Sequence, residues 1–478
     1  MRFTLLSLLI GSFLLPRVRA AEAGSFANVD ASRPEASRAE TGHLHVDPDS
    51  GDDSASGRDK PLRSIARAIK LAEPGDTIHL APVTYFQSAD FFNKHGTREK
   101  PIVLDGHGAV LDGSEPVRAS EWEALGQGLF RKAHLLPRFD KAMLGRWYFL
   151  WNGRMNHMGR TSKGPSAALK KVEELAPGEW TYVDGEDAFY LRLSEGEGLD
   201  AAHIRFPARA NGVSQGGSGS HLTIRNMTST HVYNDGFNVH GAQRALKFEN
   251  IRAVDCGDDG FSAHEDADCE IDGFVSIGNS TGLCDTVSSV TRYRNVYIRD
   301  CIGYDVFFTG DSKHSMENVL VESSAFRTLE VGQAADQLAK PDGTPSEVWL
   351  KNVVFRRNAA AVGEARVGRR GVLHMERCTW EGVNFTAAKG ASVKVSESAF
   401  GGARQESLVL QEGAVWEGRR NAYALKSFRV GQRIFSGEQF AQFREWMGGE
   451  AESVWLSESV RPAGFGANEN LVLPLRKP

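Results

Sequence analysis

Two short stretches of this chain are near copies of each other, and their spacing constrains the fold more than any other feature. Residues 234–240 read NDGFNVH and residues 258–264 read DDGFSAH, so the second stretch follows the first by 24 positions. A repeat of roughly 20 to 50 residues is typical of stacked architectures, in which one repeat cannot bury its apolar face alone. The spacing therefore predicts a solenoid in which the two stretches lie in adjacent turns.

Three aspartates meet in that arrangement. Asp235 and Asp259 hold matching positions in the two stretches, and Asp258 directly precedes Asp259. Stacked strands lie about 4.8 Å apart, so the three carboxylates are expected to lie close together. Carboxylates this close bind a metal ion, carry out acid–base chemistry or need another strong compensation. The turn-forming tendency of Asp, Asn and Gly explains one acidic residue per turn, but not three in adjacent rows.

The two histidines of the repeat belong to the same prediction. Phe237 and Phe261 have the alternation of core residues, which places Asn238, His240 and His264 on the outer face of the strands. This face is expected to form a flat groove with one row of side chains per turn. The predicted catalytic residues are Asp235, Asp258, Asp259, His240 and His264. The predicted substrate-binding residues are Asn238, Arg292 and Arg294.

The first residues predict export. Residues 1–16 contain one positive charge and a short apolar run, and small residues around Ala20 form a cleavage pattern. The run is too short to span a bilayer, and no later segment approaches about 18 uncharged apolar residues. We expect a signal peptide over residues 1–20, a flexible polar leader over residues 21–42, and a secreted or periplasmic protein after cleavage near Ala20.

Composition favours a turn-rich fold and argues against some partners. Of 478 residues, 50 are glycine and 41% are hydrophobic, which favours many turns around a sizeable core. The formal net charge of −5 argues against nucleic acid or an anionic membrane as a partner. An acidic polysaccharide stays possible because local arginines or a bound cation reverse the charge of a cleft. The five cysteines contain no CxxC pair, and we expect at most one disulfide bridge. No oligomeric state follows from the sequence.

Periodic segments predict where the solenoid begins, is interrupted and ends. We expect a strand at 43–46, an amphipathic helix at 61–72, a strand at 75–80 and two strands within 101–112. From residue 221 strands recur every 21 to 24 residues, with asparagine at the turns. A stretch over 120–205 breaks the repeat. Within it we expect hairpins at 147–153 and 178–193 and a helix at 166–175. We expect the aromatic residues of this stretch to form its own core. An amphipathic helix at 435–446 is suited to capping the last turn.

The opening segment resembles a known family. A strand, an Asp-Gly-rich loop, a helix and then PGDTI at 74–78 resemble the N-terminal cap of secreted right-handed parallel β-helix proteins, the pectin-lyase-like group. The resemblance covers residues 43–112 and resumes from about 205 to 400. It implies an all-β, right-handed parallel β-helix with an N-terminal cap helix and a small β-rich insertion. The implied parts are the cap and first coils over 43–119, the insertion over 120–205, further coils over 206–425 and a C-terminal capping segment over 426–478.

Within this group the aspartates resemble the calcium site of a pectate-lyase family, whose pattern is Asp-Gly-Phe followed by Asp-Asp-Gly-Phe-Asp. By that resemblance Asp235, Asp258 and Asp259 are calcium ligands, and Ser262 stands where that family has a fourth aspartate. The resemblance implies a metal-assisted lyase that acts on a uronic-acid-containing polysaccharide. There the cation neutralises the substrate carboxylate, and a base removes the neighbouring proton.

The expected base departs from the family pattern. The pectate-lyase family uses a lysine, whereas residues 269–333 of this chain contain only Lys313, in an unsuitable position. His264 or His240 is therefore the expected substitute, because histidine exchanges protons near neutral pH.

Two alternatives remain open. The same motifs resemble polygalacturonase-type glycoside hydrolases, in which Asp258 would be the general acid while Asp235 and Asp259 activate water in an inverting displacement. That family's later histidine and Arg-x-Lys motifs are missing here, so the sequence favours the lyase. The other alternative is a non-catalytic carbohydrate-binding or cell-surface protein.

Overall fold

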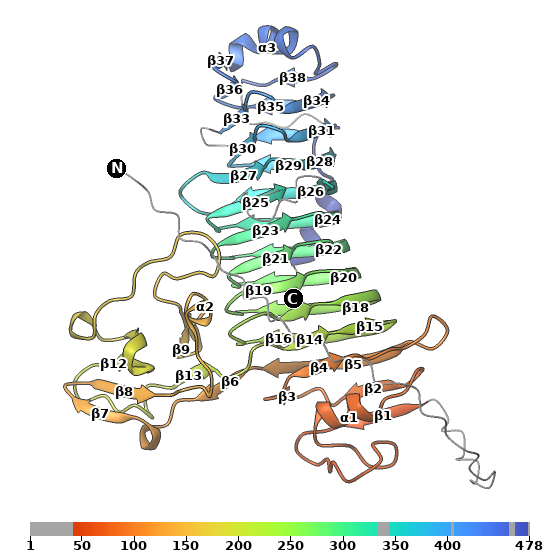
Figure 1. Ribbon diagram of the computed structural model, residues 1–478. Coiled ribbons are helices and arrows are strands. Elements are labelled where there is room, and N and C mark those ends of the chain that lie inside the picture. Colours follow the sequence, from red (N-terminus) through yellow and green to blue (C-terminus); the bar gives the residue numbers. More distant parts are fainter. Residues whose placement is uncertain (1–41, 333–343, 403–405, 458–463, 477–478) are drawn as a thin grey trace, which may run out of the picture. The chain divides into compact units, whose positions relative to one another are not determined.

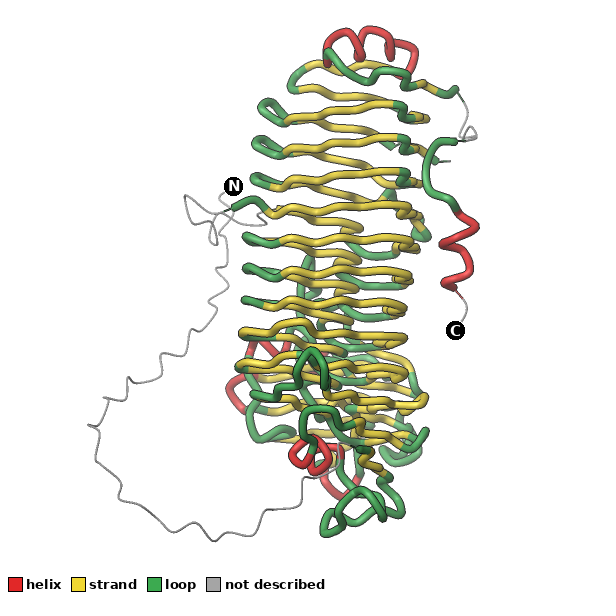
Figure 2. Tube along the Cα trace, turned by 90° about the vertical axis from the view of Figure 1, so that its right-hand side faces the viewer, coloured by secondary structure: helices red, strands yellow, loops and turns green. Residues whose placement is uncertain are grey.

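The computed structural model describes residues 42–332, 344–402, 406–457 and 464–476. Strands make up 50% of it and helices about 9%, and the chain forms a parallel β-solenoid of about 15 turns (Figures 1 and 2). This confirms the predicted parallel β-helix. The predicted signal peptide and all but the last residue of the predicted leader lie outside the described residues. Among the helices that are described, none combines the length and apolar character needed to cross a membrane.

Each full coil contributes strands to two large parallel sheets. Within the described residues one sheet has 18 strands and the other has 12. The 18-stranded sheet contains β1 (His43–Val46), β2 (Thr77–Leu80), β3 (Thr84–Tyr85), β5 (Ile102–Asp112), β15 (Ser218–Ser220), β16 (Leu222–Thr230), β18 (Ala242–Val254), β20 (Ala267–Ile277), β22 (Val290–Arg299), β24 (Lys313–Ser323), β26 (Ser346–Arg357), β28 (Gly371–Glu376), β29 (Thr379–Glu381), β31 (Ser392–Ser396), β32 (Ala399–Gly401), β34 (Val415–Arg419), β35 (Ala422–Ala424) and β38 (Val454–Trp455).

The 12-stranded sheet carries the motif that defines the repeat. Its strands are β4 (Ala89–Phe92), β14 (Val213–Gly216), β17 (Phe237–Val239), β19 (Asp259–Ala263), β21 (Thr281–Asp285), β23 (Tyr304–Thr309), β25 (Arg327–Gly332), β27 (Gly363–Val367), β30 (Val383–Ala387), β33 (Ser407–Leu410), β36 (Ser427–Val430) and β37 (Arg433–Ser436). Phe237 pairs with Phe261 in the parallel register of β17 and β19. The 24-residue spacing is therefore one coil.

The N-terminal cap follows the predicted order with two differences. Helix α1 (Ile65–Leu71) begins after Ser64, whose side chain accepts a hydrogen bond from the Arg67 backbone N–H. This N-cap makes the helix shorter than predicted, since the preceding residues are not helical. Residues 102–112 form one bent strand instead of two, with a break in register opposite Asn226.

Asparagines form a ladder at the turns, as predicted. Five of them have left-handed backbones with φ between 51° and 57°: Asn226, Asn250, Asn295, Asn318 and Asn352. Asparagine tolerates this conformation better than most residues. The Asn250 amide donates to the Asn226 side-chain oxygen at 3.0 Å, and Asn352 donates likewise to Asn318 at 2.8 Å.

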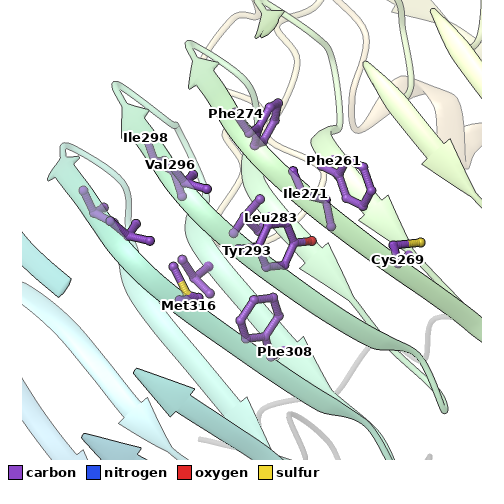
Figure 3. Packing of buried hydrophobic residues seen from close by; sticks show 14 of the residues in the cluster. Phe261, Cys269, Ile271, Phe274, Leu283, Tyr293, Val296, Ile298, Phe308 and Met316 are labelled. Carbon is purple, nitrogen blue, oxygen red and sulfur yellow. The ribbon is translucent and has the colours of Figure 1, made fainter. Parts of the chain in front are cut away.

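Apolar side chains fill the space between the sheets (Figure 3). Phe237 and Phe261 stack with their ring centroids 6.5 Å apart, and Phe248 meets Phe261 edge-on at 4.9 Å. The five cysteines, all in the described part of the chain, are buried and unbridged. The core residues predicted from alternation are thereby confirmed.

The last coil is covered by helix α3 (Phe440–Met447), which begins later than predicted because residues 433–436 form β37. Phe440 and Phe443 pack on Phe428 with ring centroids 5.5 and 4.6 Å apart. Two short helical segments, α4 (Glu469–Val472) and η5 (Leu473–Arg476), then lie against β24, where Val472 packs on Leu320.

The insertion forms two four-stranded antiparallel sheets beside the first coils (Figure 1). One contains β6 (Ser114–Pro116), β9 (Phe149–Trp151), β10 (Arg154–Asn156) and β13 (Ile204–Pro207); the other contains β7 (Glu123–Gly126), β8 (Leu129–Ala133), β11 (Glu179–Val183) and β12 (Ala188–Arg192). Its short helices are η1 (Ala119–Glu121), α2 (Lys141–Leu144), η2 (Val172–Glu174) and η3 (Asp184–Glu186).

Both predicted hairpins of the insertion are present, and its aromatic residues form its own core around Trp147, Phe149 and Phe189. The predicted helix at 166–175 is wrong, because only residues 172–174 form a helical turn. The Lys170 carbonyl instead accepts a hydrogen bond from Thr181 at 2.6 Å. This tertiary contact uses a backbone group that a helix would need.

One carboxyl group lies fully buried in the core of the solenoid. Asp305 is fully buried in β23, and neither of its carboxylate oxygens has a hydrogen bond of normal geometry. Burial raises the pKa of Asp305 to about 7. In the unfolded chain an aspartate titrates near pH 4, so the folded state retains this proton over the interval between the two values.

We therefore expect Asp305→Asn to raise the melting temperature more at about pH 8 than at about pH 5. As the pH rises from about 4 to 7, the wild-type protein loses up to about 1.4 kcal/mol of stability per pH unit through this group. Asparagine is neutral at every pH and avoids that loss. Circular dichroism melts at both pH values test this, with Asp59→Asn, at an exposed aspartate of the N-terminal cap, as control. An equal shift at both pH values contradicts the assignment.

Candidate functional site

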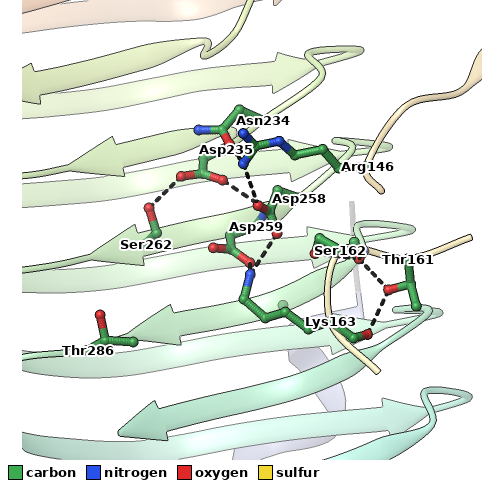
Figure 4. Close-up of polar contacts among 12 residues, drawn as sticks. Arg146, Thr161, Ser162, Lys163, Asn234, Asp235, Asp258, Asp259, Ser262 and Thr286 are labelled. Carbon is green, nitrogen blue, oxygen red and sulfur yellow. Dashed lines mark hydrogen bonds and ion pairs between the residues drawn. The ribbon is translucent and has the colours of Figure 1, made fainter. Parts of the chain in front are cut away.

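The structure brings the three aspartates of the repeat together at the edge where the strands of the 12-stranded sheet begin (Figure 4). Asp235 precedes β17, Asp258 precedes β19, and Asp259 is the first residue of β19. Carboxylate oxygens of the three lie within 4.8 Å of one another, and all three residues are buried. The Asp259 backbone N–H donates to Asp235 Oδ1 at 3.1 Å, which fixes one coil to the next.

Two cations from the insertion compensate these carboxylates. Lys163 Nζ donates to Asp258 Oδ1 and to Asp259 Oδ1, both at 2.6 Å. Arg146 Nη1 donates to Asp258 Oδ2 at 2.9 Å and also to the Asn234 side-chain oxygen. The side chains of Lys163 and Arg146 are 23% and 24% exposed, against 10% for Asp258 and 3% for Asp259. The cations are therefore more accessible than the anions that hold them.

A set of hydroxyl contacts fixes the loop that carries Lys163. Ser280 Oγ lies 2.6 Å from Thr161 Oγ1 and accepts the Ser162 backbone N–H at 3.0 Å. Thr161 Oγ1 donates to the Lys163 carbonyl at 2.9 Å. At Gly303 a Cβ atom would lie 2.3 Å from that carbonyl oxygen, so only glycine permits this approach.

Two side chains of the neighbouring strands β17 and β19 bind Asp235. Ser262 Oγ donates to Asp235 Oδ2 at 2.7 Å, and Asn238 Nδ2 donates to the same oxygen at 2.5 Å. Ser262, which stands where the pectate-lyase pattern has a fourth aspartate, therefore stabilises Asp235 through a hydrogen bond. Asn238 is buried against Asp235, and its role in substrate binding stays a prediction.

The three aspartates of the cluster have pKa values shifted in different directions. Burial and the charge of Asp258 raise the pKa values of Asp235 and Asp259. Burial acts on Asp258 too, but Lys163 and Arg146 outweigh it and hold the pKa of Asp258 below its usual range. Burial acts to lower the pKa of Lys163, but Asp258 and Asp259 outweigh it and raise that pKa well above its usual range. Lys163 is thus a firmly charged cation and a poor proton acceptor.

The two predicted histidines stack beside this cluster. The rings of His240 and His264 lie 4.5 Å apart at an angle of 9°. His264 Nδ1 lies 2.8 Å from the Thr286 hydroxyl. A ring nitrogen of His264, an Asp259 oxygen and Cys284 Sγ lie within 4.8 Å of one another. Burial and the neighbouring His240 lower the pKa of His264 to about 3, so His264 is neutral near pH 7.

The predicted arginine pair does not join the cluster. Arg292 and Arg294 lie in β22 of the 18-stranded sheet, whereas the aspartates and histidines belong to the 12-stranded sheet. Arg292 pairs with Asp268 at 2.7 Å and Arg294 with Asp272 at 3.6 Å, and both side chains are exposed. These are ordinary surface pairs, which contribute little to stability.

The cations that complete the site were not found from the sequence. Lys163 and Arg146 precede Asp258 by 95 and 112 residues and lie outside the repeat. The only sequence feature that pointed to these two residues was their position in a segment that interrupts the solenoid. The residues of an insertion have no register with the coils, so spacing alone cannot pair them with a coil position.

The expected calcium ion stays a prediction, and the arrangement offers it few free ligands. Calcium takes about six to eight oxygens. At least five of the six carboxylate oxygens of Asp235, Asp258 and Asp259 already accept hydrogen bonds from protein groups. Lys163 Nζ lies between two of the carboxylates that were the expected ligands. As arranged, these residues do not fit a calcium ion.

We expect Ser280→Ala to release the Lys163 loop. The substitution removes the acceptor of the Ser162 N–H and a partner of Thr161, and leaving buried polar groups unpaired costs about 1–3 kcal/mol. The free energy of unfolding measured by chemical denaturation should fall by that amount, and amide hydrogen exchange should speed up over residues 160–164. Ser288→Ala, at an exposed serine after β21, is the matched control. Unchanged exchange in the loop contradicts the anchoring role of Ser280.

Comparison with known proteins finds similarity over short parts of the sequence. A family model described as "Protein of unknown function (DUF1565)" matches residues 49–92. A stretch of 76 residues is 38% identical to pectate lyase PEL9 of Emericella nidulans; it covers 15% of this chain and 18% of that enzyme. The chain thus matches less than a fifth of that relative's length.

The solved structures that align with this chain have low sequence identity to it. A complex of XylC with xylose has a TM-score of 0.48 at 12% identity and covers 83% of this chain and 87% of its own. Pectate lyase Pel9A has a TM-score of 0.35 at 15% identity, with 78% of each chain covered. A rhamnogalacturonan lyase has a TM-score of 0.33 at 12% identity, with coverage of 88% and 89%. The chain itself is a parallel β-solenoid, as its resemblance to pectin-lyase-like proteins predicted.

Proposed function

We propose that this chain is an exported enzyme that cleaves a uronic-acid-containing polysaccharide by β-elimination beside the aspartate cluster. The observation that carries the proposal is a pair of partly exposed cations, Lys163 and Arg146, held by buried aspartates next to two stacked histidines. Such an arrangement presents fixed positive charge and a proton acceptor to the same small area of surface.

The cations favour an anionic substrate. Asp258 and Asp259 hold Lys163 in place, and Asp258 also holds Arg146. Neither side chain therefore loses conformational entropy when the substrate binds. Preorganised donors of this kind stabilise negative charge that develops during a reaction. The carboxylate of a uronic acid is a suitable partner because it can accept hydrogen bonds from both side chains at once.

The reaction needs a proton acceptor next to the bound carboxylate. When the carboxylate is neutralised, the proton on the adjacent carbon becomes more acidic. We propose that His240 takes this proton; a carbon–carbon double bond forms, and the glycosidic carbon–oxygen bond breaks with its electrons leaving on oxygen. A proton from solvent then completes the alcohol of the leaving chain. Lys163 is unsuited to the base role because its two ion pairs keep it charged.

The partial similarity to pectate lyase PEL9 supports elimination over hydrolysis. The spacing of the aspartates also disfavours an inverting hydrolase. Its two carboxyl groups need about 6.5–9.5 Å between them to admit a water molecule. In this cluster one carboxylate oxygen from each of the three aspartates lies within 4.8 Å of one from each of the others.

The proposal predicts an unsaturated product. The protein should be incubated with pectic, alginate and glycosaminoglycan polymers while ultraviolet absorbance and new reducing ends are recorded together. We expect both signals to rise in proportion on a uronate polymer, and rates at least about tenfold lower on its methyl ester, which cannot pair with Lys163 and Arg146. Reducing ends without absorbance would indicate a hydrolase, and binding without either signal would indicate a carbohydrate-binding protein.

His240→Gln should separate the chemical role from a structural one. Loss of a general base typically costs about 10²–10⁴-fold in kcat. Glutamine keeps a polar side chain of similar reach, so KM and the melting temperature should change little. His374→Gln, on the 18-stranded sheet, is the matched control. Full turnover in His240→Gln would move the base role to another residue.

A further inference from the structure

We propose that Lys163 takes the place of a divalent metal ion in the aspartate cluster, and that removal of the lysine converts the cluster into a calcium site. The catalytic part of this inference, activity without added metal, rests on the proposed function. The binding part concerns the free protein and stands independently of any substrate.

The position of the ammonium group supports the substitution. Lys163 Nζ lies 2.6 Å from Asp258 Oδ1 and 2.6 Å from Asp259 Oδ1. Calcium–oxygen distances in proteins are about 2.3–2.6 Å. The lysine nitrogen therefore lies at almost the distance from two carboxylates at which a bound calcium ion would lie.

The charge balance supports it as well. Lys163 and Arg146 together carry the two positive charges of one calcium ion, and both contact Asp258. Three carboxylates packed within 4.8 Å need such compensation, because isolated buried charges are strongly unfavourable. With both cations in place, a further divalent ion would have to displace one of them.

The loop that carries the lysine is built to keep it there. The Lys163 carbonyl accepts from Thr161 at 2.9 Å and lies against Gly303, while Ser280 contacts both Thr161 and Ser162. Displacement of the ammonium by a metal would break its two short ion pairs while the backbone stays anchored. The wild-type protein is therefore expected to exclude calcium.

Removal of Lys163 frees carboxylate oxygens, which are the kind of ligand that calcium prefers. Loss of the ammonium removes the shared partner of Asp258 Oδ1 and Asp259 Oδ1 and leaves these two oxygens free to bind a cation. The Ser162 side chain lies on the same loop and is 2.9 Å from Ser280, and water can complete the coordination. Hard oxygen ligands of this kind favour calcium over softer metals.

The test is calcium binding to the free protein by isothermal titration calorimetry, together with thermal melts. Metal-free wild-type protein should show no saturable binding at millimolar calcium and no change in melting temperature. Lys163→Met should melt at a lower temperature without calcium, because its carboxylates lack a partner. Calcium should bind it at least about 100-fold more tightly than it binds the wild-type protein and should restore the melting temperature.

Two further variants keep the result interpretable. Lys163→Gln retains a neutral hydrogen-bond donor, so it tests the same gain of binding if Lys163→Met does not fold. Asp259→Asn in the Lys163→Met background should abolish the gained binding. Lys170→Met, which removes an exposed lysine of the same insertion paired with Glu179, is the matched control and should bind no calcium.

Saturable calcium binding by the wild-type protein at this cluster overturns the inference, and so does a folded Lys163 variant that gains none. A separate measurement tests the catalytic part. Cleavage of the uronate polymer by the wild-type protein should be unchanged by a chelator, whereas loss of cleavage with chelator would contradict metal independence. If no polymer is cleaved while the variants gain calcium, the proposed function fails and the substitution stands.

Discussion

The in-register stacking of one coil on the next is the constraint from which the rest of this structure follows. Parallel pairing puts Phe237 over Phe261 in the core. By the same register it places Asp235 beside Asp259. A backbone that repeats every 24 residues cannot separate these carboxylates without breaking hydrogen bonds along two strands. The acidic cluster is therefore a direct consequence of the repeat, and its charge has to be compensated from elsewhere.

That compensation ties the insertion to the solenoid. Lys163 and Arg146 both reach the cluster from the insertion, while the Tyr148 hydroxyl donates to the Asp255 carbonyl at 2.9 Å. Gly257 leaves room for the Arg146 carbonyl, since a Cβ there would lie 2.3 Å from its oxygen. Removing one partner of a buried ion pair typically costs about 3–5 kcal/mol. The ion pairs of Lys163 and Arg146 therefore both attach the insertion to the solenoid and hold the site together.

The sequence predicted what depends on periodicity and missed what depends on contact between non-repeating segments. The strands, the asparagine turns and the proximity of the three aspartates follow from spacing alone. The placement of Arg292 in the 18-stranded sheet does not follow from spacing. The pattern of a strand shows which face of a sheet a residue occupies but not to which sheet the strand belongs. The failed helix at 166–175 and the unforeseen Lys163 have one cause. Both lie in the insertion, where tertiary contacts outweigh local propensity and no repeat fixes the register.

The roles of the motif residues change once their partners are known. Aspartates in a repeated Asp-Gly-Phe motif look like groups that act on a substrate, yet Asp235 and Asp259 are buried beneath other side chains. Their oxygens bind Lys163, Ser262, Asn238 and the next strand rather than open solvent. Asp258 and Asp259 hold Lys163, Asp258 also holds Arg146, and both cations are partly exposed. Within the cluster the acidic motif therefore acts by holding two cations, Lys163 and Arg146.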